Sequence, residues 1–147
     1  MFKILFALHL LTAIFAIGPL VHAATTAARG LRQADAGATA TSARTITIYS
    51  YVSVLVVVLG FGVMSSKRHG HTVAEFSEAW IWVSALLWLV AVGIALALVV
   101  PALQQATTRI TVGEAVDSLT ARVAAGGGVI GLIFAGIVFL MVYKPGR

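Results

Sequence analysis

An apolar stretch near the end of the chain, residues 123–143, decides the fold: VAAGGGVIGLIFAGIVFLMVY. These 21 residues include no Asp, Glu, Lys or Arg. A helix of this length, at about 1.5 Å per residue, crosses the roughly 30 Å hydrocarbon core of a bilayer. Because charged side chains are costly at the bilayer centre, a charge-free run of this length predicts a membrane-spanning helix.

Three earlier stretches have the same character. Residues 4–28, 45–66 and 79–108 contain 25, 22 and 30 residues without Asp, Glu, Lys or Arg. Trp80 marks the start of the third of these stretches, and we expect Pro101 to end its regular part. We therefore predict an all-α fold, a polytopic membrane four-helix bundle. It forms a single integral membrane domain over residues 1–147, with spans at about 4–26, 45–65, 79–100 and 123–143.

The composition excludes an ordinary soluble domain. Of the 147 residues, 60% are hydrophobic and 10% are charged, and the mean hydropathy is +1.01, whereas soluble domains carry about a quarter charged residues. The net charge of +5 comes from scattered Lys and Arg, which form no basic stripe, so we expect no nucleic-acid partner. Without cysteine, the chain has no disulfide, no catalytic thiolate and no Cys-ligated metal. The lipid bilayer is the expected partner.

The charged residues lie outside the four predicted spans. With four spans both termini share one side of the membrane, and each side then carries five Lys and Arg residues. The positive-inside rule therefore leaves both orientations open. Proton pumps and ion-coupled transporters usually place charged groups at membrane depth, so we do not expect either function.

The connections between the spans differ in character. Residues 23–43 are rich in Ala, and residues 112–123 carry Val or Leu every three or four positions, so we predict that both stretches are helical. The connection that contains His69 and His71 is interpreted as a solvated loop at the membrane surface.

The first span also has features of a secretory signal. Lys3, an apolar run to Ile17 and the small-residue segment ending at Ala23 follow the order of a cleavable signal peptide. The uncharged stretch is longer than a normal signal core, however. We therefore expect a retained span with a kink at Gly18-Pro19, with cleavage as the alternative.

His9 lies in the middle of the first span, between Leu8 and Leu10. An imidazole facing lipid would lack hydrogen bonds, so we expect it to face the bundle interior. Two interpretations stay open at this point. His9 is either a ligand of haem or a metal, or a histidine hydrogen-bonded to a Ser, Thr or carbonyl of a neighbouring helix. The hydroxyl stripe Thr47, Ser50 and Ser53 of the second span offers such partners.

The fourth span carries a face of small residues, which lets another helix approach closely. The residues that we assign to this packing face are Ala124, Gly127, Gly128, Gly131 and Ala135. The partner is either another span of the same chain or a second subunit.

The segment Lys3 to Leu11, the Gly18-Pro19 pair, Gly60-Phe61-Gly62 and Trp80 together resemble an uncharacterised bacterial family of small four-helix integral membrane proteins. That family is similar to a wider group that includes copper-resistance D proteins and the membrane-bound, haem-associated protoporphyrinogen oxidase. The resemblance implies a place in the bacterial inner membrane, His9 as a cofactor ligand and haem as the candidate cofactor. This chain lacks the intramembrane Lys and the second midspan His of the oxidase.

Two functions follow from these features. No phosphate loop, dinucleotide fingerprint or nucleophile with a base is present, so no catalytic residue is assigned and we do not expect an enzyme. The first hypothesis is a non-enzymatic binding or accessory protein that packs through the glycine-rich fourth helix against a membrane protein partner or a second copy of itself. The alternative is a haem- or copper-associated membrane redox or transport protein that uses His9.

Overall fold

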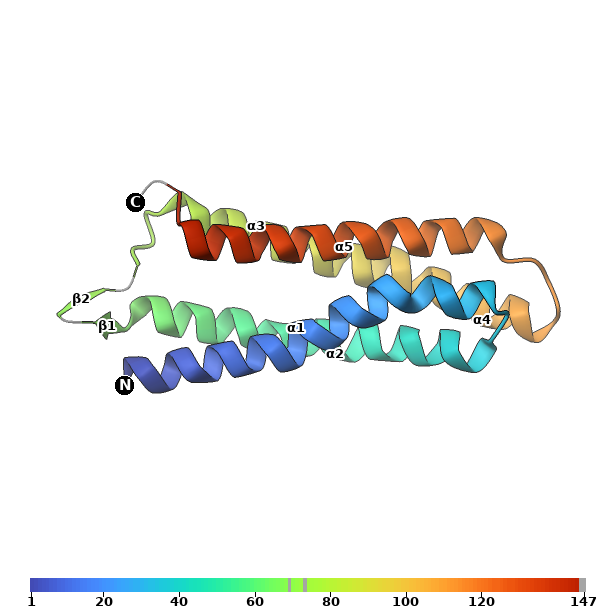
Figure 1. Ribbon diagram of the computed structural model, residues 1–147, viewed down its shortest axis with the longest axis horizontal. Coiled ribbons are helices and arrows are strands. Elements are labelled where there is room, and N and C mark those ends of the chain that lie inside the picture. Colours follow the sequence, from blue (N-terminus) through green and yellow to red (C-terminus); the bar gives the residue numbers. More distant parts are fainter. Residues whose placement is uncertain (69, 73, 146–147) are drawn as a thin grey trace.

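The computed structural model describes residues 1–68, 70–72 and 74–145 and consists of four long antiparallel helical segments (Figure 1). The elements in chain order are α1 (Phe2–Arg32), α2 (Ala36–Ser65), β1 (Lys67–Arg68), β2 (His71–Thr72), α3 (Ala79–Ile94), the π-helical η1 (Ala95–Val99), α4 (Val100–Thr111) and α5 (Asp117–Tyr143). The four segments pack together, and each is long and apolar enough to cross a membrane. The predicted all-α membrane bundle is thus confirmed, and the chain is a multi-pass membrane protein.

The helices form a ring in which the third segment changes neighbours. α1 lies between α2 and α5, α3 packs on α5, and α4 packs on α2. Both termini and the β1–β2 hairpin lie at one end of the bundle, and the two tight connections lie at the other (Figure 1). His69, in the hairpin connection, lies outside the described residues.

The connection between α1 and α2 is helical on both sides of a three-residue turn. Ala34 adopts a positive φ of 50°, and the Asp35 carboxylate accepts a hydrogen bond from the backbone N–H of Ala38 at 2.9 Å. Asp35 is thereby the N-cap of α2. The helical prediction for residues 23–43 holds except at residues 33–35, where this capped turn reverses the chain.

The helical prediction for residues 112–116 is wrong. α4 ends at Thr111 because Gly113 takes a φ of 76°, which glycine adopts without strain. The N–H of Gly113 donates to the carbonyl of Ile110 at 3.1 Å, and the N–H of Glu114 donates to that of Arg109 at 2.9 Å. This is the Schellman arrangement, which ends a helix at a C-terminal glycine.

Pro101 does not end the third span, contrary to the sequence expectation. Proline removes a backbone donor and clashes with the carbonyl four residues earlier. The π-helical turn of η1 precedes it, and α-helical geometry continues through Pro101 to Thr111. Such a widened turn is a common device inside helices. Pro19 likewise lies inside a continuous α1, which bends in its middle (Figure 1).

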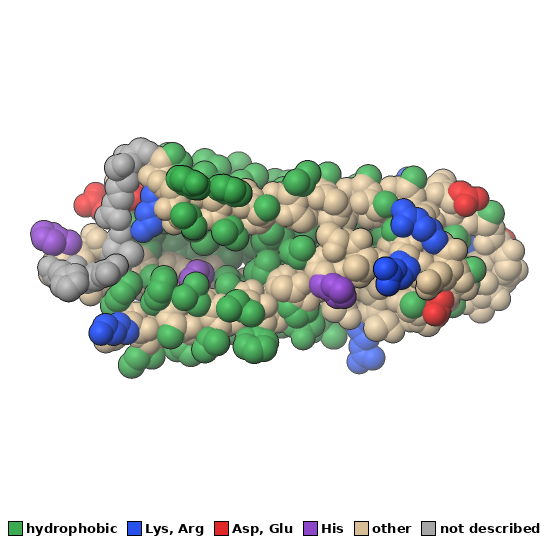
Figure 2. Space-filling model, in the orientation of Figure 1, with side chains coloured by type: hydrophobic (Ala, Val, Ile, Leu, Met, Phe, Trp, Pro, Cys, Tyr) green, Lys and Arg blue, Asp and Glu red, His purple; other side chains and the backbone are tan. Residues whose placement is uncertain are grey.

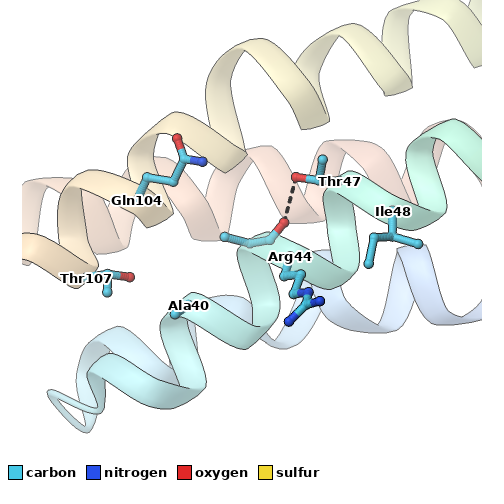
Figure 3. A pocket seen from close by; sticks show the side chains of 7 residues that line it. Ala40, Arg44, Thr47, Ile48, Gln104 and Thr107 are labelled. Carbon is cyan, nitrogen blue, oxygen red and sulfur yellow. Dashed lines mark hydrogen bonds between the residues drawn. The ribbon is translucent and has the colours of Figure 1, made fainter.

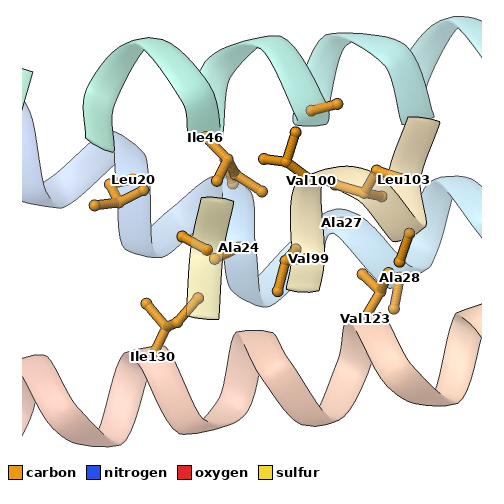
Figure 4. Close-up of a cluster of buried hydrophobic side chains, with 14 of the residues drawn as sticks. Leu20, Ala24, Ala27, Ala28, Ile46, Val99, Val100, Leu103, Val123 and Ile130 are labelled. Carbon is orange, nitrogen blue, oxygen red and sulfur yellow. The ribbon is translucent and has the colours of Figure 1, made fainter. Parts of the chain in front are cut away.

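Small residues close one half of the bundle, which we call the closed half (residues 16–47 and 99–128). Alanines of α1 meet apolar side chains of the other helices in its core (Figure 4). A Cβ atom at Gly127 would overlap the backbone carbonyl of Ala24, and one at Gly126 would lie 2.7 Å from a Val99 methyl. Gly127 lets α5 approach the backbone of α1, and Gly126 makes room for the Val99 side chain of η1.

The other half of the bundle, which we call the open half (the described residues of 1–15, 48–98 and 129–145), is less tightly packed. None of the first 15 residues is buried, and Figure 2 shows a hollow between the upper and lower helices at the end with the termini. Exposed large apolar side chains gather in the half of the bundle that holds the termini. Their limits are Phe15 on α1, Ile48 on α2, Leu98 on η1 and Val129 on α5, and among the described residues Val112 is the one such side chain outside these limits. From this belt we predict that the open half lies in the hydrocarbon and that the bundle leaves the hydrocarbon within the closed half.

Cysteine accessibility tests this placement, because the chain has no cysteine of its own. Thr41→Cys and Gln105→Cys, on exposed positions of the closed half, are expected to react with a membrane-impermeant maleimide in permeabilised vesicles. Leu55→Cys and Leu89→Cys, in the apolar belt, are expected to stay unlabelled until detergent is added. Equal labelling of both pairs before detergent would contradict the placement.

The backbone contact of Gly127 predicts a strong effect from a single methyl group. Gly127→Ala is expected to lower the free energy of unfolding by at least about 2 kcal/mol, because neither backbone can yield without separating the helices. The matched control is Gly128→Ala, since no atom of the described residues lies within 4 Å of a Cβ there, and its effect should stay within about 0.5 kcal/mol. Denaturation in detergent micelles, followed by circular dichroism, measures both; equal stability of the two variants would contradict the contact.

Candidate functional site

The His9 imidazole lies against α2. Its Nδ1 atom is 3.0 Å from the backbone carbonyl oxygen of Val56, about midway along the exposed apolar belt of α2. A carbonyl can only accept, so Nδ1 carries a proton and donates it. The carbonyl has two lone pairs and accepts this bond in addition to its bond within the helix.

Gly60 provides the surface on which the ring rests. A Cβ atom at Gly60 would lie 3.1 Å from Cε1 of His9 and 3.6 Å from its Nδ1. Gly60 follows Val56 by one helical turn, so the carbonyl and the glycine share one face of α2. One turn before His9 on α1, Leu5 lies 3.9 Å from the Cβ position of Gly62, two residues after Gly60. The glycine-containing end of the second span therefore adjoins the early histidine.

The second ring nitrogen of His9 is available for a ligand. With Nδ1 protonated, neutral His9 has its lone pair on Nε2, and no described residue bonds that atom. A histidine fixed through Nδ1–H to a carbonyl, with Nε2 free, is the usual arrangement of a metal-binding histidine. Among the described residues, however, no three His, Cys, Asp or Glu side chains come together as a metal site.

His9 bonds a carbonyl of the neighbouring helix, as one of the two interpretations from the sequence expects, but the hydroxyl stripe of α2 does not bind it. Ser53 accepts a hydrogen bond from Trp88 of α3 at 3.0 Å and donates to the carbonyl of Ser50 at 2.6 Å, and Thr47 donates to the carbonyl of Ala43. The buried Ser50 hydroxyl has no partner in the described structure. Val56 is the partner instead, and a backbone carbonyl has no residue-type signal in the sequence.

The small residues assigned to the packing face of α5 point in several directions. Gly127 meets the backbone of α1, and a Cβ at Gly131 would lie 3.4 Å from the Thr25 methyl. Ala124 is partly buried, whereas Gly128 and Ala135 are exposed. One part of the face therefore serves the fold of this chain, and another part faces outward.

A groove between α2 and α4 adds a feature that sequence reasoning missed (Figure 3). Its volume is about 600 Å³, and its lining residues are Ala40, Ala43, Arg44, Thr47, Ile48, Gln104 and Thr107. The lining residues of α2 and those of α4 are about 60 positions apart along the chain, so only the packing of α2 against α4 brings them together. The groove lies beside the boundary of the apolar belt at Ile48.

Comparisons with models of protein families, with curated proteins and with solved structures found no match, so no family is identified.

The tautomer of His9 is a direct prediction of the site geometry. In protein labelled with ¹⁵N-histidine, the His9 signals should show a protonated Nδ1 and an unprotonated Nε2, because Nδ1 faces a carbonyl. Comparison with His9→Gln assigns those signals among the four histidines. A His9 protonated at Nε2 alone would contradict the bond to Val56.

Proposed function

We propose that this chain is a non-enzymatic binding or accessory protein of the bacterial inner membrane that associates with another transmembrane helix through the outward part of α5. The observation that carries the proposal is the exposure of Gly128 and Ala135, seven residues apart on one side of that helix. Within the described residues, nothing lies within 4 Å of a Cβ at Gly128. Small residues on an apolar helix allow close packing of a further helix, and no helix of the described structure occupies this position.

Purification in mild detergent tests this proposal. After subtraction of bound detergent, the protein mass of the wild-type complex is expected to exceed the 15.3 kDa of one chain, as a homo-oligomer or with a membrane protein partner. Gly128→Leu should release the monomer, because the side chain would hold the partner helix away. Gly93→Leu is the control, since Gly93 is also exposed and without neighbours within 4 Å. A lone monomer in the mildest detergents would contradict the proposal.

A second candidate function is haem binding through His9. Its support is the orientation of the imidazole, in which Nδ1–H is held by Val56 and Nε2 keeps a free lone pair. One protein nitrogen suffices for an axial haem ligand, so His9 would be the residue that holds the haem. Bound haem would supply redox chemistry at membrane depth.

An absorption spectrum distinguishes this second candidate. Protein expressed with haem supplied should show a Soret band that His9→Ala abolishes, whereas His22→Ala should retain it. A colourless wild-type preparation, or an equal band in both variants, would exclude His9 as the ligand.

A further inference from the structure

We infer that the groove between α2 and α4 binds one anionic phospholipid, with its phosphate at Arg44. The polar groups of the groove favour an anion. Arg44 is exposed, and the one ion pair among the described residues joins Arg109 to Glu114, so the guanidinium of Arg44 has no acidic partner there. No Asp or Glu lines the groove.

Two side chains that line the groove have N–H donors without a hydrogen bond in the described structure. The hydroxyl protons of Thr47 and Thr107 already bond carbonyls of their own helices, at 2.8 and 2.9 Å. The guanidinium of Arg44 and the amide of Gln104, on the opposite wall, are not used in this way, and in Figure 3 they point in different directions. A guanidinium binds phosphate oxygens through two parallel N–H bonds, so Arg44 is the group that would hold the phosphate.

The position of the groove selects a lipid over a free anion. Ile48 lies one helical turn from Arg44, is 47% exposed and begins the exposed apolar surface of α2. The groove therefore runs from a cation at the membrane surface to side chains that face hydrocarbon. A phospholipid matches both parts, because its phosphate lies at the interface and its acyl chains continue along Ile48. A free phosphate would satisfy Arg44 but leave the apolar part uncovered.

Native mass spectrometry of the full chain, titrated with phosphatidylglycerol or phosphatidylcholine, tests the proposal. The wild-type chain is expected to retain one phosphatidylglycerol in preference to phosphatidylcholine. Arg44→Gln should weaken this binding about fivefold, the effect of one interfacial cation. Ala40→Trp keeps every charge but fills the groove, and it should also weaken binding. Circular dichroism checks that both variants fold.

Arg122→Gln is the matched control, because Arg122 is an exposed arginine of the closed half on α5, outside the groove. It should leave phosphatidylglycerol binding unchanged. Equal losses in Arg44→Gln and Arg122→Gln would show general attraction to anionic lipid and overturn the proposal. Unchanged binding in Ala40→Trp, equal retention of the two lipids, or displacement of phosphatidylglycerol by millimolar inorganic phosphate would also overturn it.

Discussion

Direct backbone contact between α1 and α5 is the constraint on which the rest of the structure depends. Gly127 has no Cβ, and the carbonyl of Ala24 occupies the space that a Cβ would need. This approach brings the Ala-rich face of α1 within reach of α5 and lets short side chains fill the core. Close packing of small residues supplies much of the attraction between apolar helices of this kind.

Because the closed half supplies most of the packing, side chains of the open half are available for binding. Because the buried residues of α1 begin at Ala16, the first four turns of that helix make few core contacts, and His9 rests on Gly60 of α2. The outward face of α5 and the groove at Arg44 lie on the outside of the same scaffold. Packing and candidate binding surfaces are therefore separated in space, so that one can be altered without loss of the other.

The sequence predicts the four helices well, because charge-free stretches report directly on the cost of placing charge in lipid. It predicts the direction of individual side chains poorly. Gly127 and Gly128 look equivalent in sequence, yet a rotation of about 100° per residue turns one to α1 and the other outward. The helix continues through Pro101 because a π-helical turn precedes it, and the expectation that proline ends the regular helix did not include this accommodation.

The candidate sites depend even more on tertiary pairing. His9 could be selected from the sequence because an imidazole at membrane depth must find a partner. Its partner, the Val56 carbonyl, could not be predicted, since every residue has a carbonyl. Arg44 and Gln104 acquire a common groove only when α2 packs against α4. A glycine such as Gly113 is itself a signal for the end of a helix. The spacing of the apolar residues on either side of it, however, predicts a continuous helix.

Disulfide trapping in native membranes tests the contact between α1 and α5 most directly, because the chain has no cysteine. A Cβ at Gly131 would lie 3.4 Å from a side-chain atom of Thr25, so Thr25→Cys combined with Gly131→Cys should form an intramolecular disulfide under mild oxidation. Thr25→Cys combined with Gly128→Cys should not, because Gly128 faces away. No cross-link in the first pair, or equal cross-linking in both, would contradict the helix register that holds this bundle together.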